Sequence, residues 1–125
     1  MTDSVDRLYD AVLEAKDSDP GRSRTARLFR AGRSKIVKKL AEEAIEVVID
    51  AMNGDRNAVV RESADLLYNL VVVWAACGVR PSEVWKEMER RERLFGIAEK
   101  LLKGGMLAKR AKVVAPVARR QRQGR

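Results

Sequence analysis

The sequence predicts an all-α fold, an antiparallel bundle of about four to five helices. Apolar residues recur at helical spacing between the turns, and no segment shows the strict alternation of a half-buried strand. Aromatic residues make up 5% of the 125 residues and the chain has three prolines, a composition that suits helices rather than a sheet. A chain of this size would leave part of its apolar surface exposed, so we expect a homodimer to complete the bundle.

The first two helices are predicted from apolar spacing and a turn. Residues 17–21 are a turn by composition, since Pro20 disfavours helix in the residue before it. The basic segment 22–32 should form a loop and then a short helix that Gly32 closes. Apolar positions at helical intervals predict a preceding helix over about 4–16, namely Val5, Leu8, Val12 and Leu13.

Two long helices should follow, joined by a tight turn. The first is expected to begin at Ser34 as its N-cap and to end at the turn Asn53-Gly54-Asp55. Asp55 can cap the second, which we expect over about 56–77. Beyond Asp65 this helix is nearly all apolar, which predicts that it is buried on every side.

The last predicted helix covers about 81–102, with Pro81 in its first turn. We place the globular domain in residues 1–103 and a basic tail in residues 104–125. The tail holds seven of the 26 Lys and Arg residues and no acid, which leaves 19 basic against 18 acidic residues in the domain. The tail should therefore be dispensable for chemistry and act only through its charge.

Several classes of protein are excluded or disfavoured by composition. The longest apolar run, Leu70–Val79, has ten positions, short of the ~20 that a membrane span needs, and the first residues contain no apolar signal segment. Cys77 is the one cysteine and cannot form an intrachain disulfide, so we expect a cytoplasmic protein. The chain has no histidine, which excludes histidine-based catalytic dyads and triads and histidine-containing zinc sites.

Two pairs of carboxylates flank the predicted turn at equal distances. The inner acids Glu46 and Glu62 are each eight residues from Gly54, and the outer acids Glu43 and Asp65 are each eleven. Each pair has i,i+3 spacing and shares one helix face. In an antiparallel hairpin all the carboxylates would meet at one level, where such close like charges require cations. Because the donors are all oxygens, the expected ion is Mg²⁺, with Mn²⁺ also possible.

An alternative is that these acids form structural salt bridges with Lys38 and Lys39, one helical turn before them. Asn69 lies one turn beyond Asp65 and extends the same polar stripe, which favours a site instead. We therefore expect Asn69 to face the substrate.

The residues around the carboxylates carry a resemblance to a known family. The run Lys38-Lys39-Leu-Ala-Glu42-Glu43-Ala-Ile-Glu46-Val precedes Asn53-Gly-Asp, and Glu62-Ser-Ala-Asp65-Leu-Leu-Tyr68 follows. With these motifs the chain resembles the phosphoribosyl-ATP pyrophosphatase family over about residues 8–91. That family belongs to the all-α nucleoside-triphosphate pyrophosphatases, which share ExxE followed by ExxD.

The sequence departs from the family pattern at two places. Where the family usually reads Pro-Glu-Gly-Ser-Tyr-Thr, this chain has Pro20-Gly-Arg-Ser23-Arg-Thr25, which adds Arg22 and Arg24. Where the family has Tyr-His after ExxD, this chain has Tyr68-Asn69. The carboxylates themselves match the pattern.

The resemblance implies Mg²⁺-dependent hydrolysis of 1-(5-phosphoribosyl)-ATP to 1-(5-phosphoribosyl)-AMP and pyrophosphate, the second step of histidine biosynthesis, by a homodimer. It implies metal ligation by Glu43, Glu46, Glu62 and Asp65. Without histidine a carboxylate must take the proton of the attacking water, and Glu42 or Glu46 is the candidate. Basic residues are candidates for binding the substrate phosphates, namely Lys38, Lys39, Lys35, Arg27 and Arg24. Thr25 also falls in the family register and should line the substrate.

Two other functions remain open. A housekeeping pyrophosphatase for other (d)NTPs would use the same carboxylates. The basic tail alternatively indicates a non-enzymatic nucleic-acid or partner-binding module. The scarcity of aromatic residues and the lack of a base-reading element oppose this second reading, so no nucleic-acid partner is expected.

Overall fold

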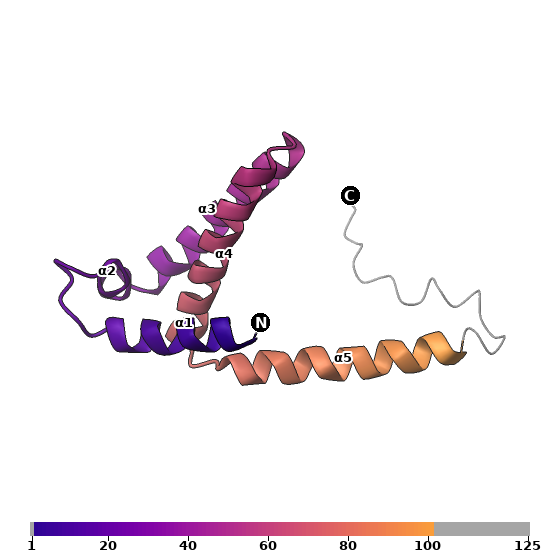
Figure 1. Cartoon of the computed structure of the whole chain (residues 1–125). Coiled ribbons are helices and arrows are strands. Elements are labelled where there is room, and N and C mark those ends of the chain that lie inside the picture. Colours follow the sequence, from indigo (N-terminus) through magenta and orange to yellow (C-terminus); the bar gives the residue numbers. More distant parts are fainter. Residues whose placement is uncertain (1, 102–125) are drawn as a thin grey trace. The chain divides into compact units, whose positions relative to one another are not determined.

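The computed structural model of the chain describes residues 2–101. Within them the regular structure is entirely helical, which confirms the predicted all-α fold (Figure 1). The helices are α1 (Thr2–Ala15), α2 (Arg24–Ala31), α3 (Arg33–Met52), α4 (Arg56–Cys77) and α5 (Pro81–Leu101). The chain divides into two compact units, residues 1–84 and a second unit that begins at Trp85. The proposed boundary at residue 103 and the tail 104–125 lie outside the described residues.

Helices α3 and α4 form an antiparallel hairpin (Figure 1). Gly54 turns the chain with φ of 71°, a left-handed conformation that glycine adopts without a steric cost. The Asp55 side chain then accepts a hydrogen bond from the Ala58 amide at 3.1 Å, which confirms the predicted cap of α4. The predicted ends of this hairpin are therefore correct at the turn.

The connection from α2 to α3 differs from the prediction in one detail. Gly32 closes α2 as expected, with its amide donating to the Leu28 carbonyl. It also directly precedes α3, which begins at Arg33. The expected N-cap at Ser34 is wrong, because the positive φ of 102° at Gly32 lets the next helix begin at once and places Ser34 inside its first turn.

The core of the first unit lies where α1, α2 and the start of α3 meet the second half of α4. Phe29, Tyr68 and Trp74 are partly buried and pack against this core. The expected burial of α4 on every side is wrong, since Leu67 is 48% exposed. The buried centre consists of Val12, Leu28, Ile36, Val71 and Val72.

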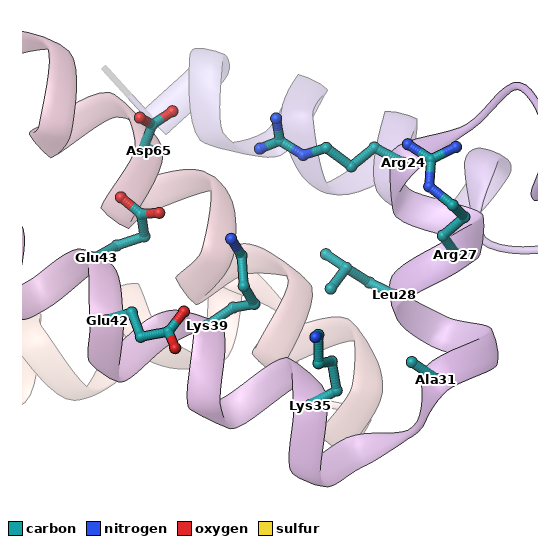
Figure 2. Close-up of a pocket in the computed structure, with 9 residues that line it drawn as sticks. All are labelled: Arg24, Arg27, Leu28, Ala31, Lys35, Lys39, Glu42, Glu43 and Asp65. Atoms are coloured by element: carbon teal, nitrogen blue, oxygen red, sulfur yellow. The ribbon is translucent and has the colours of Figure 1, made fainter.

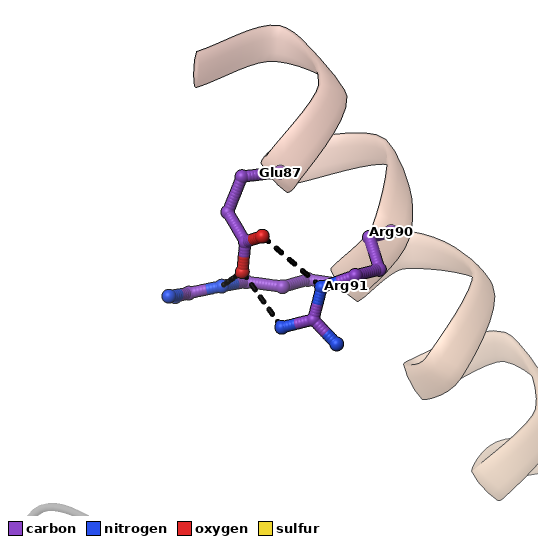
Figure 3. A network of polar contacts seen from close by, with 3 residues as sticks. All are labelled: Glu87, Arg90 and Arg91. Atoms are coloured by element: carbon purple, nitrogen blue, oxygen red, sulfur yellow. Dashed lines mark hydrogen bonds and ion pairs between the residues drawn. The ribbon is translucent and has the colours of Figure 1, made fainter. Parts of the chain in front are cut away.

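In the second unit, α5 carries a network of exposed ion pairs (Figure 3). Both Arg90 and Arg91 donate to the Glu87 carboxylate, at 2.7 and 2.9 Å. These hydrogen bonds lower the pKa of Glu87 to about 2. Exposed pairs of this kind support the helix only weakly. Among the described residues no single helix is long and apolar enough to cross a membrane, and only α4 and α5 taken together as one broken segment reach that length and composition.

Candidate functional site

The hairpin brings three of the predicted carboxylates together. Glu43 of α3 and Glu62 and Asp65 of α4 each offer an oxygen, and these oxygens all lie within 4.8 Å of one another. All three side chains are half-buried. The equal spacing about Gly54 in the sequence thus becomes proximity across the hairpin.

The negative charges of these carboxylates lie close together and act on one another. A side-chain hydrogen bond with Glu43 raises the pKa of Glu62 above its ordinary value of 4.5, and desolvation raises it further. The charges of Glu43, Asp65 and Glu46 add to the same effect. Glu46 is therefore close enough to act on the group electrostatically, although it is not one of the acids whose oxygens converge.

A cavity of about 530 Å³ opens beside the carboxylates, between α2 and the α3–α4 hairpin (Figure 2). Two carboxylates of the group, Glu43 and Asp65, lie at one end of it, and Glu42 lines the same wall. Leu28 and Ala31 supply the apolar part of the lining. Basic side chains line the rest, namely Arg24, Arg27, Lys35 and Lys39. The cavity therefore runs from an acidic end to a basic wall.

The two arginines of the basic wall lie on α2, and contacts of α2 attach them to the hairpin. The hydroxyls of Thr25 and Tyr68 lie 2.6 Å apart in a hydrogen bond that joins α2 to α4. The Arg24 guanidinium stacks over the Tyr68 ring, 4.9 Å from its centroid. Arg27 donates from Nη1 to the Pro20 carbonyl at 2.9 Å. Tyr68 is part of the sequence motif but was not predicted to belong to the site, although its position three residues after Asp65 places it on the same helix face.

Four other predicted site residues do not line the cavity. Thr25 is buried and bonded to Tyr68 rather than lining the cavity. Asn69 is 2% exposed, and its Nδ2 donates to the Asp65 carbonyl at 2.8 Å. Lys38 is exposed and Glu46 is exposed, and neither is among the residues that line this cavity.

The converging donors fit a hard divalent cation. Glu43, Glu62 and Asp65 supply only carboxylate oxygens, which such ions prefer. The charges of Glu43, Asp65 and Glu46 are among the causes that raise the pKa of Glu62, so the carboxylates of the group repel one another. A bound cation would remove this repulsion. The salt bridges with Lys38 and Lys39, the alternative to a cation site, are not formed in the described part of the chain.

The comparisons with known proteins all point to one family, and they cover most of the chain. The model of the family described as phosphoribosyl-ATP pyrophosphohydrolase matches residues 5–92. The chain is 68% identical over 116 residues to "Phosphoribosyl-ATP pyrophosphatase 2" of Bradyrhizobium diazoefficiens, which covers 93% of this chain and 85% of that relative. It is 65% identical over 121 residues to the protein of the same name from Rhodopseudomonas palustris, covering 97% and 89%. A "Phosphoribosyl-ATP pyrophosphatase" of Granulibacter bethesdensis is 45% identical over 107 residues, covering 86% and 67%.

Proposed function

This chain belongs to the phosphoribosyl-ATP pyrophosphohydrolase family, and we propose that it hydrolyses 1-(5-phosphoribosyl)-ATP to 1-(5-phosphoribosyl)-AMP and pyrophosphate in histidine biosynthesis. The observation that carries the proposal is the cavity that joins the carboxylates to the basic wall. A polyphosphate ester needs both features, because its charge must be neutralised and its oxygens must be held in place.

The acidic end would hold Mg²⁺, with Glu43, Glu62 and Asp65 as ligands and Glu46 as a further candidate. When bound there, the ion supplies charge neutralisation and polarisation of the phosphorus that is attacked. The carboxylates hold their positions because two rigid helices carry them and a short turn sets their register.

The proton of the attacking water needs a base, and the chain has no histidine. Glu42 lines the cavity directly beside Glu43, and we assign its carboxylate oxygen as the acceptor, with Glu46 as the second candidate. Lys39 is half-buried and is the residue of the basic wall that lies next to Glu43 (Figure 2). It would hold oxygens of the departing pyrophosphate.

We also propose that the protein is a cytoplasmic homodimer. Exposed apolar side chains follow one stripe of α3, and α4 adds Val60 and Leu67. Such a surface is typical of a helix-to-helix interface between copies. The stripe on α3 comprises Val37, Ile45, Val48, Ile49 and Met52.

The direct test is pyrophosphate release from phosphoribosyl-ATP in the presence of Mg²⁺, compared with a panel of NTPs and dNTPs. Glu43→Gln should reduce turnover by at least about 100-fold, since it removes a ligand of the ion on which charge neutralisation depends. Glu14→Gln, an exposed acid on α1, is the matched control and should leave turnover as in the wild type.

Faster turnover of another nucleotide than of phosphoribosyl-ATP would overturn the substrate assignment and favour a housekeeping pyrophosphatase. Equal turnover by wild type and Glu43→Gln would overturn the assignment of the carboxylates. Absence of any Mg²⁺-dependent pyrophosphate release, together with salt-sensitive RNA binding, would favour the nucleic-acid module instead.

A further inference from the structure

We propose that the cavity binds two separate phosphate groups at its two ends, and that Arg27 and Lys35 bind the one that is not cleaved. The inference rests on the proposed function, because phosphoribosyl-ATP carries a triphosphate and, separately, the phosphate monoester of its phosphoribosyl group. A site for this substrate has to neutralise both groups, and a cation held by carboxylates can serve only the nearer one.

The order of the side chains along the cavity supports this division (Figure 2). Glu43 and Asp65 lie at the left of the view, and Arg27 lies at the right, on α2. The Arg24 guanidinium lies between them, as expected from its stacking on Tyr68, which follows Asp65 by one helical turn. Arg24 therefore belongs with the triphosphate end, and Arg27 with the opposite end.

Arg27 and Lys35 form no ion pair with any residue that the structure describes. In the part of the chain that the structure describes, the ion pairs are those of Glu87 with Arg90 and Arg91 on α5. Two cations that line one cavity without an acidic partner repel each other and favour a bound anion. A phosphate monoester has the charge and the acceptor oxygens that match them.

Arg27 is also held in place for such a contact. Its Nη1 donates to the Pro20 carbonyl at 2.9 Å, which fixes the guanidinium while its other nitrogen donors stay available. Lys35 comes from the next element, in the first turns of α3, and Gly32 joins the two helices. Basic donors from two helices thus line the same cavity.

The size of the cavity agrees with a ligand that spans it. A volume of about 530 Å³ falls within the usual range for sites that enclose a small organic ligand. The nucleoside would occupy the middle, against Leu28. A nucleotide without the phosphoribosyl group would leave Arg27 and Lys35 without an anion.

The experiment compares the binding of phosphoribosyl-AMP and of AMP by calorimetry, with Mg²⁺ present and no turnover required. Wild type should prefer phosphoribosyl-AMP by about 10- to 100-fold, the effect of hydrogen bonds to a charged group. Arg27→Gln and Lys35→Gln should each reduce this preference by about tenfold, and Arg27→Lys should retain part of it. Arg24→Gln should weaken both ligands alike. The matched controls are Arg30→Gln on the same helix and Lys86→Gln on α5, both exposed, and they should keep the wild-type preference.

A wild type without preference for phosphoribosyl-AMP would overturn the inference, as would Arg27→Gln and Lys35→Gln proteins that keep the full preference. Equal weakening of both ligands by these variants would place the residues at the nucleotide phosphate and overturn it too. Wild-type hydrolysis of phosphoribosyl-ATP is measured separately. A protein that hydrolyses it without this binding preference disproves only the subsite, whereas one that has the preference but no hydrolysis disproves only the proposed function. Circular dichroism spectra confirm that each variant remains helical.

Discussion

Glu62 binds a proton more tightly in the folded chain than in the unfolded chain. Its hydrogen bond with Glu43 is the largest cause of the raised pKa, followed by desolvation and by the neighbouring negative charges. A group with a raised folded pKa contributes stability below its unfolded pKa, and this contribution is lost as pH rises through the folded value. The ionised Glu62 side chain, beside Glu43 and Asp65, should therefore destabilise the cation-free protein at neutral pH.

A pH series tests this effect. In a chelating buffer, the melting temperature of the wild type should fall as pH rises above 4.5, the ordinary pKa of Glu62, towards neutrality. Glu62→Gln cannot ionise and should show a flatter profile over the same window. Identical slopes for the two proteins would mean that the pKa of Glu62 is not raised in the folded protein.

Tyr68 is a second residue whose effect on stability depends on one hydrogen-bond partner, in this case Thr25. Tyr68→Phe removes the hydrogen bond to Thr25, a residue only 8% exposed, and leaves a buried hydroxyl without that partner. We expect a loss of about 1–2 kcal/mol in the free energy of unfolding, measured in urea. Tyr9→Phe is the control, since the Tyr9 hydroxyl makes no hydrogen bond within the described residues. Equal losses in both variants would contradict the role of the contact.

At the scale of helices, the ends set by local chemistry could be predicted from the sequence. Asp55 caps α4 and Gly54 reverses the chain, because both effects depend on residues within one turn of each other. Ser34 was a plausible cap by type, but the backbone at Gly32 decides where α3 begins. The glycine indicates a turn at this point, but its residue type does not show at which residue the next helix begins.

In the candidate site, too, the features set by local spacing could be predicted, and the contacts between distant residues could not. The spacing of Glu43, Glu62 and Asp65 predicted their convergence, because residues at equal distances from a short turn lie at the same level of the two helices. The contact between Thr25 and Tyr68 joins residues 43 positions apart, and spacing alone cannot place α2 against α4. Asn69 shares a stripe with Asp65, but it lies on the buried side of that stripe and bonds its own helix.

The exposed apolar stripe of α3 leads to a prediction about assembly. Val48→Lys places a charge at a position that is 60% exposed, so the single chain should fold while the helix-to-helix interface is lost. Light scattering should give twice the chain mass of 14.1 kDa for the wild type and one chain mass for the variant. Ala11→Lys adds the same charge at an exposed position on α1, away from the stripe, and should remain a dimer. A monomeric wild type would contradict the proposed interface.

At the scale of the whole molecule, the carboxylates and the basic wall belong to one compact unit, residues 1–84. A cation that binds only the assembled site should therefore stabilise that unit as a whole. At Mg²⁺ about 100-fold above its Kd the gain is about 2.7 kcal/mol, visible as a higher melting temperature. Asp65→Asn should show a smaller rise, and Asp10→Asn on α1 the wild-type rise. Equal rises in wild type and Asp65→Asn would mean that the ion binds elsewhere.

The short turn at Gly54 also bears on the order in which the chain folds. Contacts between α3 and α4 close a small loop, whereas α2 reaches Tyr68 only across 43 residues. Local contacts form with the smaller loss of chain entropy, so the hairpin should assemble before the wall that α2 provides. Its gathered carboxylates would then repel each other already in the folding transition state. Added Mg²⁺ should consequently accelerate refolding more than it slows unfolding, which stopped-flow measurements with and without the ion can establish.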